Sequence, residues 1–155
     1  MGAFSSRRVD GLRRRRDVAG LVDQLQNGGE QDRRAAANAL VAIPDPRAVD
    51  PLVDALGAGD WLLRLNAAIA LGEYRESPFD GDIRRIVDPL TQALLDQQPS
   101  VRAAAASALG QLRDPAAVEP LIETLDDDNA AVGKTAALVL RGFDDERARA
   151  AIAAR

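Results

Sequence analysis

The 155-residue sequence contains no cysteine and no histidine. Without cysteine the chain has no disulfide bond and no thiolate nucleophile, and without histidine it lacks the commonest zinc ligand and a usual general base. Aromatic residues are scarce as well: one tryptophan, one tyrosine and three phenylalanines. Because hydrolytic or metal chemistry would depend on carboxylates alone, we expect a non-catalytic protein with no cofactor and no metal site.

Long apolar runs are also missing. No segment approaches the roughly 20 apolar residues that span a bilayer, and the first residues lack the hydrophobic core of a secretion signal. We therefore expect a soluble cytoplasmic protein with no membrane span. The basic residues are 19 arginines and a single lysine, and aspartate outnumbers glutamate 18 to 6, a bias typical of GC-rich prokaryotic genomes.

One hydrophobic pattern recurs four times along the chain. It reads Val-x-x-Leu-hydrophobic-x-x-Leu, then a polar break, then Arg-x-x-Ala-x-x-x-Leu. Leu40, Leu71, Leu109 and Leu140 mark the same place in each copy, at separations of 31, 38 and 31 residues, and a seven-residue insert at 76–82 lengthens the middle one. A period in this range is typical of stacked helical repeats, and apolar spacings of three and four predict amphipathic helices.

These observations predict an all-α protein of about four helix pairs with a short capping helix at each end. Residues 1–16 are expected to form a basic N-terminal cap, with a truncated helix at 5–12, and residues 17–155 the repeat domain. The repeats are placed at about 17–45, 46–75, 83–114 and 115–145, followed by a C-terminal capping helix at 146–154.

Two segments carry the most specific signal. From position 45 the chain reads Asp-Pro-Arg-Ala-Val-Asp-Pro-Leu-Val-Asp-Ala-Leu, and from 114 it reads Asp-Pro-Ala-Ala-Val-Glu-Pro-Leu-Ile-Glu-Thr-Leu. In both, the Asp-Pro pair predicts the cap and first turn of a helix. From about residue 17 to 146 the pattern resembles the short HEAT-like repeat, the kind also described from phycobilin lyase subunits. The resemblance implies a right-handed α-α superhelix.

The resemblance also implies a structural ladder between aspartates and arginines. HEAT-like repeats often carry an Asp near the end of the first helix and an Arg early in the second. Asp96 with Arg102 matches both positions, whereas Arg33 and Arg64 match the Arg alone. The last copy has Asp127 but a glycine where the Arg is expected. We therefore expect an incomplete ladder at both ends.

A protein-binding site is predicted on the second helices, which usually line the concave surface of HEAT-like arrays. Away from the core stripe, only the second copy is apolar there, and exposed apolar patches with a tryptophan often mark interfaces. The alternative is that the insert folds back and that Phe79 or the lengthened helix of the third copy covers the patch. Phe79 is otherwise a candidate loop contact. The predicted protein-binding set is Trp61, Leu62, Leu65, Asn66, Ile69, Arg34, Lys134 and Leu138.

The charge is uneven, with a net of +5 over residues 1–16 and −9 over residues 17–155. When the sequence is aligned with itself one repeat period of 31 residues later, Arg13, Arg14, Arg15 and Arg16 match residues 44–47. That segment is a turn between two copies, where all four arginines can be solvated. Three interpretations stay open: contact with an acidic partner, including the edge at 126–128 of another copy; contact with nucleic acid, which the acidic body opposes; and a solvated terminus.

Two function classes follow. The first is a non-catalytic scaffold or adaptor that binds a protein partner through the concave face of the array. The alternative, implied by the resemblance, is a lyase-like or chaperone subunit that handles a bilin or tetrapyrrole, or its acceptor protein. A third HEAT-like class, the iron-dependent hydroxylases, is excluded because its metal is held by His-Glu pairs.

Overall fold

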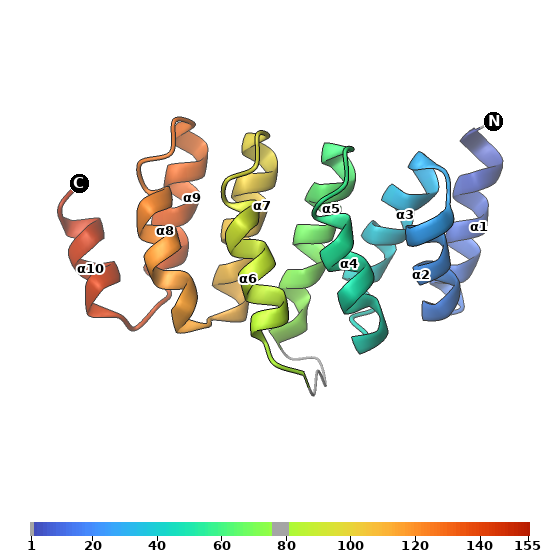
Figure 1. Ribbon diagram of the computed structural model, residues 1–155, viewed down its shortest axis with the longest axis horizontal. Helices are drawn as coiled ribbons and strands as arrows, with labels where there is room; N and C mark the ends of the chain where they lie inside the picture. Colours follow the sequence, from blue (N-terminus) through green and yellow to red (C-terminus); the bar gives the residue numbers. More distant parts are fainter. Residues whose placement is uncertain (1, 76–80) are drawn as a thin grey trace.

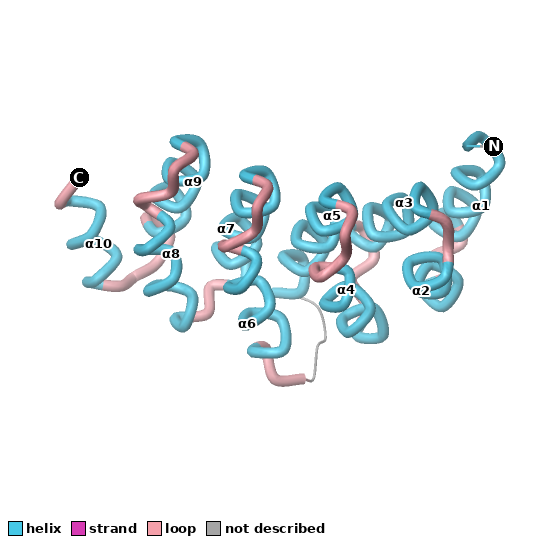
Figure 2. Tube along the Cα trace, turned by 45° about the horizontal axis from the view of Figure 1, so that its top comes forward, coloured by secondary structure: helices cyan, strands magenta, loops and turns pink. Residues whose placement is uncertain are grey.

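The computed structural model describes the backbone of residues 2–75 and 81–155 and the side chains from residue 7 onward in these ranges. The described residues form ten α-helices and no strand. Figures 1 and 2 show the helices standing in pairs along the longest axis, in chain order from one terminus to the other. This arrangement confirms the all-α solenoid, with a capping helix at each end, that the repeat pattern predicts.

Each repeat consists of a first and a second helix joined by a short turn. The N-terminal cap, α1, extends from Gly2 to Arg14 and is longer than the predicted 5–12. The first helices are α2 (Val18–Asn27), α4 (Val49–Ala55), α6 (Arg84–Ala93) and α8 (Val118–Thr124). The second helices are α3 (Glu30–Val41), α5 (Trp61–Gly72), α7 (Pro99–Leu112) and α9 (Ala130–Leu140), and α10 (Glu146–Ala153) closes the row.

The helices form two layers. In one layer α1, α3, α5, α7 and α9 pack each against the next. In the other layer α2 contacts α4, α4 contacts α6, and α10 contacts α8. We call the exposed sides of these layers the second-helix face and the first-helix face.

The sequence predicts that each Asp-Pro pair forms the cap and first turn of a first helix. In the structure a short 3-10 turn lies between the Asp-Pro pair and the helix. Asp45 accepts a hydrogen bond from the Arg47 amide (3.0 Å) and caps a 3-10 turn, η1 (Pro46–Ala48), before α4 begins at Val49. Asp114 caps η3 (Pro115–Ala117) in the same way. The reason is a second proline a few residues on. Pro51 has no N–H, so it is best accommodated in the first turn of an α-helix, where amides have no intrahelical partner. The first helix α6, which no Asp-Pro turn precedes, instead contains Pro89 in its interior.

The core is a repeated Leu and Ala pair on each second helix. Leu40, Leu71, Leu109 and Leu140 are fully buried, and the alanine four residues before each one is buried as well. A small residue one turn from a large one lets neighbouring helices approach closely and interlock. The same contact therefore recurs from each repeat to the next.

Glycines mark the closest approaches within the second-helix layer. A Cβ on Gly72 of α5 would lie 3.0 Å from Cα of Ala108 on α7, and a Cβ on Gly110 of α7 would lie 2.7 Å from Val139 Cγ1 on α9. The second helices are therefore packed more tightly than a side chain at these positions allows.

Tyr74 fastens the end of the second repeat to the turn that precedes it. It lies in a second 3-10 turn, η2 (Glu73–Arg75), and its hydroxyl donates to the Asp45 carbonyl (2.8 Å) and accepts from the Asp45 amide (3.2 Å). Burial raises the pKa of the phenol to about 12, so it stays protonated at physiological pH.

We predict that Gly72→Ala destabilises the fold by about 1–3 kcal/mol, because the added methyl forces α5 away from α7. Gly11→Ala is the matched control. It lies inside α1 with no atom within 4 Å of the added Cβ, so it is expected to stabilise the fold by about 0.5–1 kcal/mol through helix propensity. Urea unfolding followed by circular dichroism measures both. Equal effects of the two substitutions would contradict the close approach.

Candidate protein-binding face

The start of α5 positions the predicted patch. The Asp60 carboxylate accepts from the Leu62 amide (3.1 Å), which caps the helix and places Trp61 at its first position. Trp61 is 40% exposed and Ile69, about 12 Å further along the helix, is 39% exposed, while Leu62 and Leu65 are half-buried. These four residues lie along one helix and present an apolar strip to solvent.

A groove accompanies this strip. Ile69 forms one wall, and α7 supplies a floor of small side chains from Ala103, Ala104 and Ser107, enclosing about 530 Å³. On the far side α7 packs against α9, which carries Leu138, 65% exposed. The second-helix face thus has a shallow floor on α7 between apolar side chains on α5 and α9.

Sequence reasoning missed the floor residues. Ala103, Ala104 and Ser107 are small residues of the third repeat, and the sequence predicts an apolar patch in the second repeat alone. The signal that could have found them is their position: small residues on successive turns of the helix between the two that carry Ile69 and Leu138. The prediction that Phe79 covers or extends the site lies outside the described residues.

The polar residues of the predicted set have different roles. Asn66 donates from Nδ2 to the Arg34 carbonyl (3.2 Å), which holds α5 against α3. The Arg34 guanidinium is bound to Asp60 (Nη2 to Oδ1, 2.9 Å) and to Glu30, and this contact holds the pKa of Asp60 below its usual value. Lys134 is exposed and has no ion-pair partner in the part of the chain that the structure describes. Arg34 is therefore committed to the fold, whereas Lys134 is available to a partner.

Arginine and aspartate pairs join each repeat to the next. Arg64 binds the Asp96 carboxylate through two hydrogen bonds of 2.7 and 2.9 Å, and Arg102 binds Asp127 through two of 2.7 Å. Each arginine also donates to a carbonyl of its own repeat, Arg64 to Ala58 (2.8 Å) and Arg102 to Asp96 (2.8 Å). The guanidinium groups consequently hold their own turn and fasten it to the following one.

The ladder changes at its first rung. Arg33 donates to the Leu25 carbonyl (3.0 Å) within its own repeat. In the second repeat Ala58 stands at the aspartate position, so an equivalent carboxylate is not there for Arg33 to bind. The next residue, Arg34, pairs instead with the helix cap Asp60. The rung between the first two repeats is thus shifted by one residue from the predicted Arg33.

The last repeat ends differently. Gly133 takes the arginine position, and a Cβ there would lie 2.8 Å from the Leu125 carbonyl oxygen. The backbone of the turn therefore comes closer than any side chain would allow. Asp126 instead binds Arg155, which follows α10.

Comparison with known proteins agrees with this architecture. A family model of HEAT repeats matches residues 18–80 and 87–155, and a model of the HEAT-like repeat matches residues 61–112. The chain belongs to the HEAT-repeat family. A crystal structure of an engineered protein is 26% identical over 89% of this chain and 67% of its own, with a TM-score of 0.64. No curated protein matches the sequence. HEAT repeats generally act as protein-interaction scaffolds.

The arginine cluster lies at the N-terminal end of the HEAT array, with Arg13 and Arg14 in the last turn of α1 and Arg15 and Arg16 in the turn that leads to α2. Arg13, Arg14, Arg15 and Arg16 are all exposed. Arg16 takes a left-handed conformation (φ 53°), and Asp17 then caps α2 by accepting from the Gly20 amide (2.9 Å). Because the helix ends at Arg14 and the chain turns at Arg16, all four consecutive arginines stay in water; their role in binding remains a prediction.

Two further features of the HEAT array bear on its class. Among residues 2–75 and 81–155 no cluster of acidic side chains could hold a metal ion. None of the helices in this part of the chain is long and apolar enough to cross a membrane.

The aspartates of the ladder make the free energy of unfolding depend on pH in the acidic range. Burial opposes ionisation of Asp96, but hydrogen bonds from Arg64 and the Gln98 amide outweigh it, so its pKa lies below the usual 3.8. The Arg102 hydrogen bonds likewise lower the pKa of Asp127. A carboxylate with a lowered folded-state pKa stabilises the fold above its unfolded-state pKa. That stabilisation is lost as the pH falls through the folded value.

We predict that Asp96→Asn lowers the free energy of unfolding at pH 7 by about 3 kcal/mol, because the mostly buried Arg64 loses its counter-charge. The variant should also show a weaker dependence of stability on pH below 4 than the wild type. Asp50→Asn, which breaks an exposed pair with Arg85, is the control and should change little. Urea titrations at several pH values measure both effects, and parallel pH curves for wild type and Asp96→Asn would refute the ladder's role.

Proposed function

We propose that this HEAT array is a non-catalytic adaptor that binds a protein partner on its second-helix face, across α5, α7 and α9. The observation that carries the proposal is the groove of about 530 Å³ over α7. Exposed Ile69 lines it, and Trp61 extends the apolar strip along α5. Exposed Leu138 lies on the next second helix, α9, one repeat period of 31 residues after the floor residue Ser107. Side chains of this kind are costly to leave in water and supply most of the energy of protein interfaces.

The shape of the groove indicates the form of the partner segment. A floor of alanine and serine between two apolar ridges accepts one row of protruding side chains. An amphipathic helix presents such a row at spacings of three, four and seven residues. Lys134, one turn before Leu138 on α9, would favour a carboxylate beside that row.

The bilin-handling alternative fits the charges of the same face less well. A bilin carries two carboxylates, which call for cations beside an apolar site. Arg34 is bound to Asp60 and Glu30, and Arg64 is bound to Asp96. Lys134 is the one basic residue of Arg34, Arg64 and Lys134 that has no ion-pair partner among the described residues. These contacts support a protein partner.

The single tryptophan gives a direct test. We predict that a partner purified by capture on the wild-type protein shifts the emission of Trp61 to shorter wavelength on titration, because binding removes the indole from water. Ile69→Gln combined with Leu138→Gln should weaken that affinity at least tenfold, since each change removes an exposed apolar contact of about 1–2 kcal/mol.

The control is Asp54→Asn, an exposed residue of α4 on the first-helix face, which should leave the affinity unchanged. Circular dichroism of all variants checks that the helices are intact. Unaltered Trp61 emission, or equal affinity of the double variant and the control, would reject the second-helix face as the binding site.

A further inference from the structure

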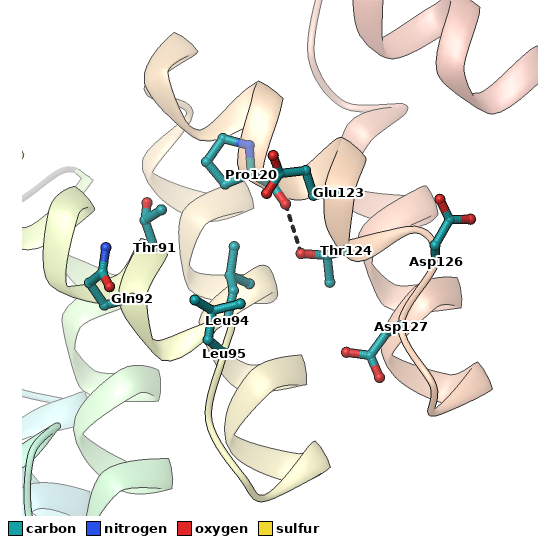
Figure 3. Close-up of a pocket in the computed structure, with 9 residues that line it drawn as sticks. All are labelled: Thr91, Gln92, Leu94, Leu95, Pro120, Glu123, Thr124, Asp126 and Asp127. Atoms are coloured by element: carbon teal, nitrogen blue, oxygen red, sulfur yellow. Dashed lines mark hydrogen bonds between the residues drawn. The ribbon is translucent and has the colours of Figure 1, made fainter.

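A separate pocket opens on the first-helix face, at the carboxyl ends of α6 and α8. Figure 3 shows its walls: Leu94 and Leu95 at the end of α6 face Pro120 and Thr124 of α8, with acidic side chains at the rim. The enclosed volume is about 360 Å³. This pocket is on the opposite layer from the groove proposed above, so it is a second site.

Leu95 makes the pocket unusual for this chain. It is 79% exposed, more than any other large apolar side chain that the structure describes. The preceding Leu94 is buried and occupies the core position that ends each first helix. The residues that follow this core leucine in the other repeats are Gln26, Gly57 and Asp126. Core packing therefore does not require an apolar side chain at position 95.

The pocket arises from the packing of the two layers. On the first-helix face, α6 contacts the fourth repeat at η3, which precedes α8. The residues of the fourth repeat that line the pocket begin at Pro120, in the first turn of α8, and continue to Asp127, beyond the end of that helix. The second helices of these two repeats, α7 and α9, pack directly against each other, whereas α6 meets the fourth repeat mainly at η3, and the pocket occupies the space that remains between α6 and α8.

The rim of the pocket is negative. Glu123, Asp126 and Asp127 line it, and no arginine or lysine does. The carbonyl ends of α6 and α8 lie at the same edge and add partial negative charge. Asp127 is committed to Arg102, whereas Glu123 has no ion-pair partner among the described residues. One rim carboxylate already binds a guanidinium, since Asp126 forms an exposed pair with Arg155, which does not itself line the pocket.

We propose that this pocket binds a basic linear segment of a partner protein. One bulky apolar side chain of the segment enters between Leu95 and Pro120, and a neighbouring arginine or lysine contacts Glu123 and takes the place of Arg155 on Asp126. The exchange costs little because an ion pair in water contributes little to stability. Apolar contact at Leu95 supplies affinity, and the acidic rim selects basic over acidic segments.

The test uses a fluorescein-labelled peptide of sequence Ala-Leu-Arg-Ala-Ala-Leu-Arg-Ala and a matched peptide with glutamate in place of arginine. Fluorescence polarisation with the full chain should show binding of the basic peptide, weaker at higher salt, and no binding of the acidic one. Leu95→Gln, which introduces the side chain that the first repeat carries at this position, should weaken binding at least tenfold. Glu123→Gln should weaken it several-fold.

Leu138→Gln on the second-helix face is the control and should bind the peptide as the wild type does. The peptide contains no tryptophan, so Trp61 emission reports separately on the other face and should not change. Leu95→Gln should have the same melting temperature as the wild type, because the Leu95 side chain is exposed.

Three outcomes would overturn the proposal. Equal binding of the basic peptide to wild type and Leu95→Gln would show that the pocket does not hold it. A shift of Trp61 emission would place the peptide on the second-helix face. Self-association in sedimentation experiments that Leu95→Gln abolishes would assign the pocket to a second copy of this chain.

Discussion

The fold depends on the packing of each helix pair against the next. A single helix pair cannot bury its own apolar residues, because the side of each helix that faces away from the pair stays exposed to solvent. Leu71 and Ala67 of one repeat are buried only because α3 and α7 lie on either side of α5. Stability in such an array is roughly a sum over neighbouring contacts, and the two end helices are required to cover the outermost stripes. The arginine and aspartate pairs follow the same logic, since each one fastens one repeat to its neighbour.

The second helices pack closely against one another, whereas the first helices contact their neighbours less. The two candidate binding sites lie one on each of these layers. Glycine at positions 72 and 110 lets the second helices come together more closely than any side chain would permit. Small residues on α7 then leave a shallow floor between exposed side chains of α5 and α9. On the opposite layer the carboxyl ends of α6 and α8 leave a pocket beside Leu95. The two proposed sites differ in chemistry: the second-helix face combines apolar side chains with Lys134, and the pocket on the first-helix face combines Leu95 with an acidic rim.

The ladder and the binding face show how far sequence reasoning extends. The positions of Arg64, Asp96, Arg102 and Asp127 could be named from the repeat, because they recur at the same offset from a core leucine. The shift from Arg33 to Arg34 could not, because it depends on whether a carboxylate in the neighbouring repeat is within reach. The apolar strip on α5 was visible as Trp61, Leu65 and Ile69, whereas the floor on α7 was not, since alanines indicate a site only when the helices beside them are known.

The sequence by itself determined the class of fold, the number of repeats and the core of each, because period and apolar spacing are properties of the chain read in order. It also excluded chemistry that needs cysteine or histidine. Only the tertiary structure decided which arginine meets which aspartate, that the Asp-Pro turns are 3-10 turns before the helices begin, and where the two layers separate into a groove and a pocket. These features depend on distances between different repeats, and such distances are set by side-chain volume at contacts that no single repeat contains.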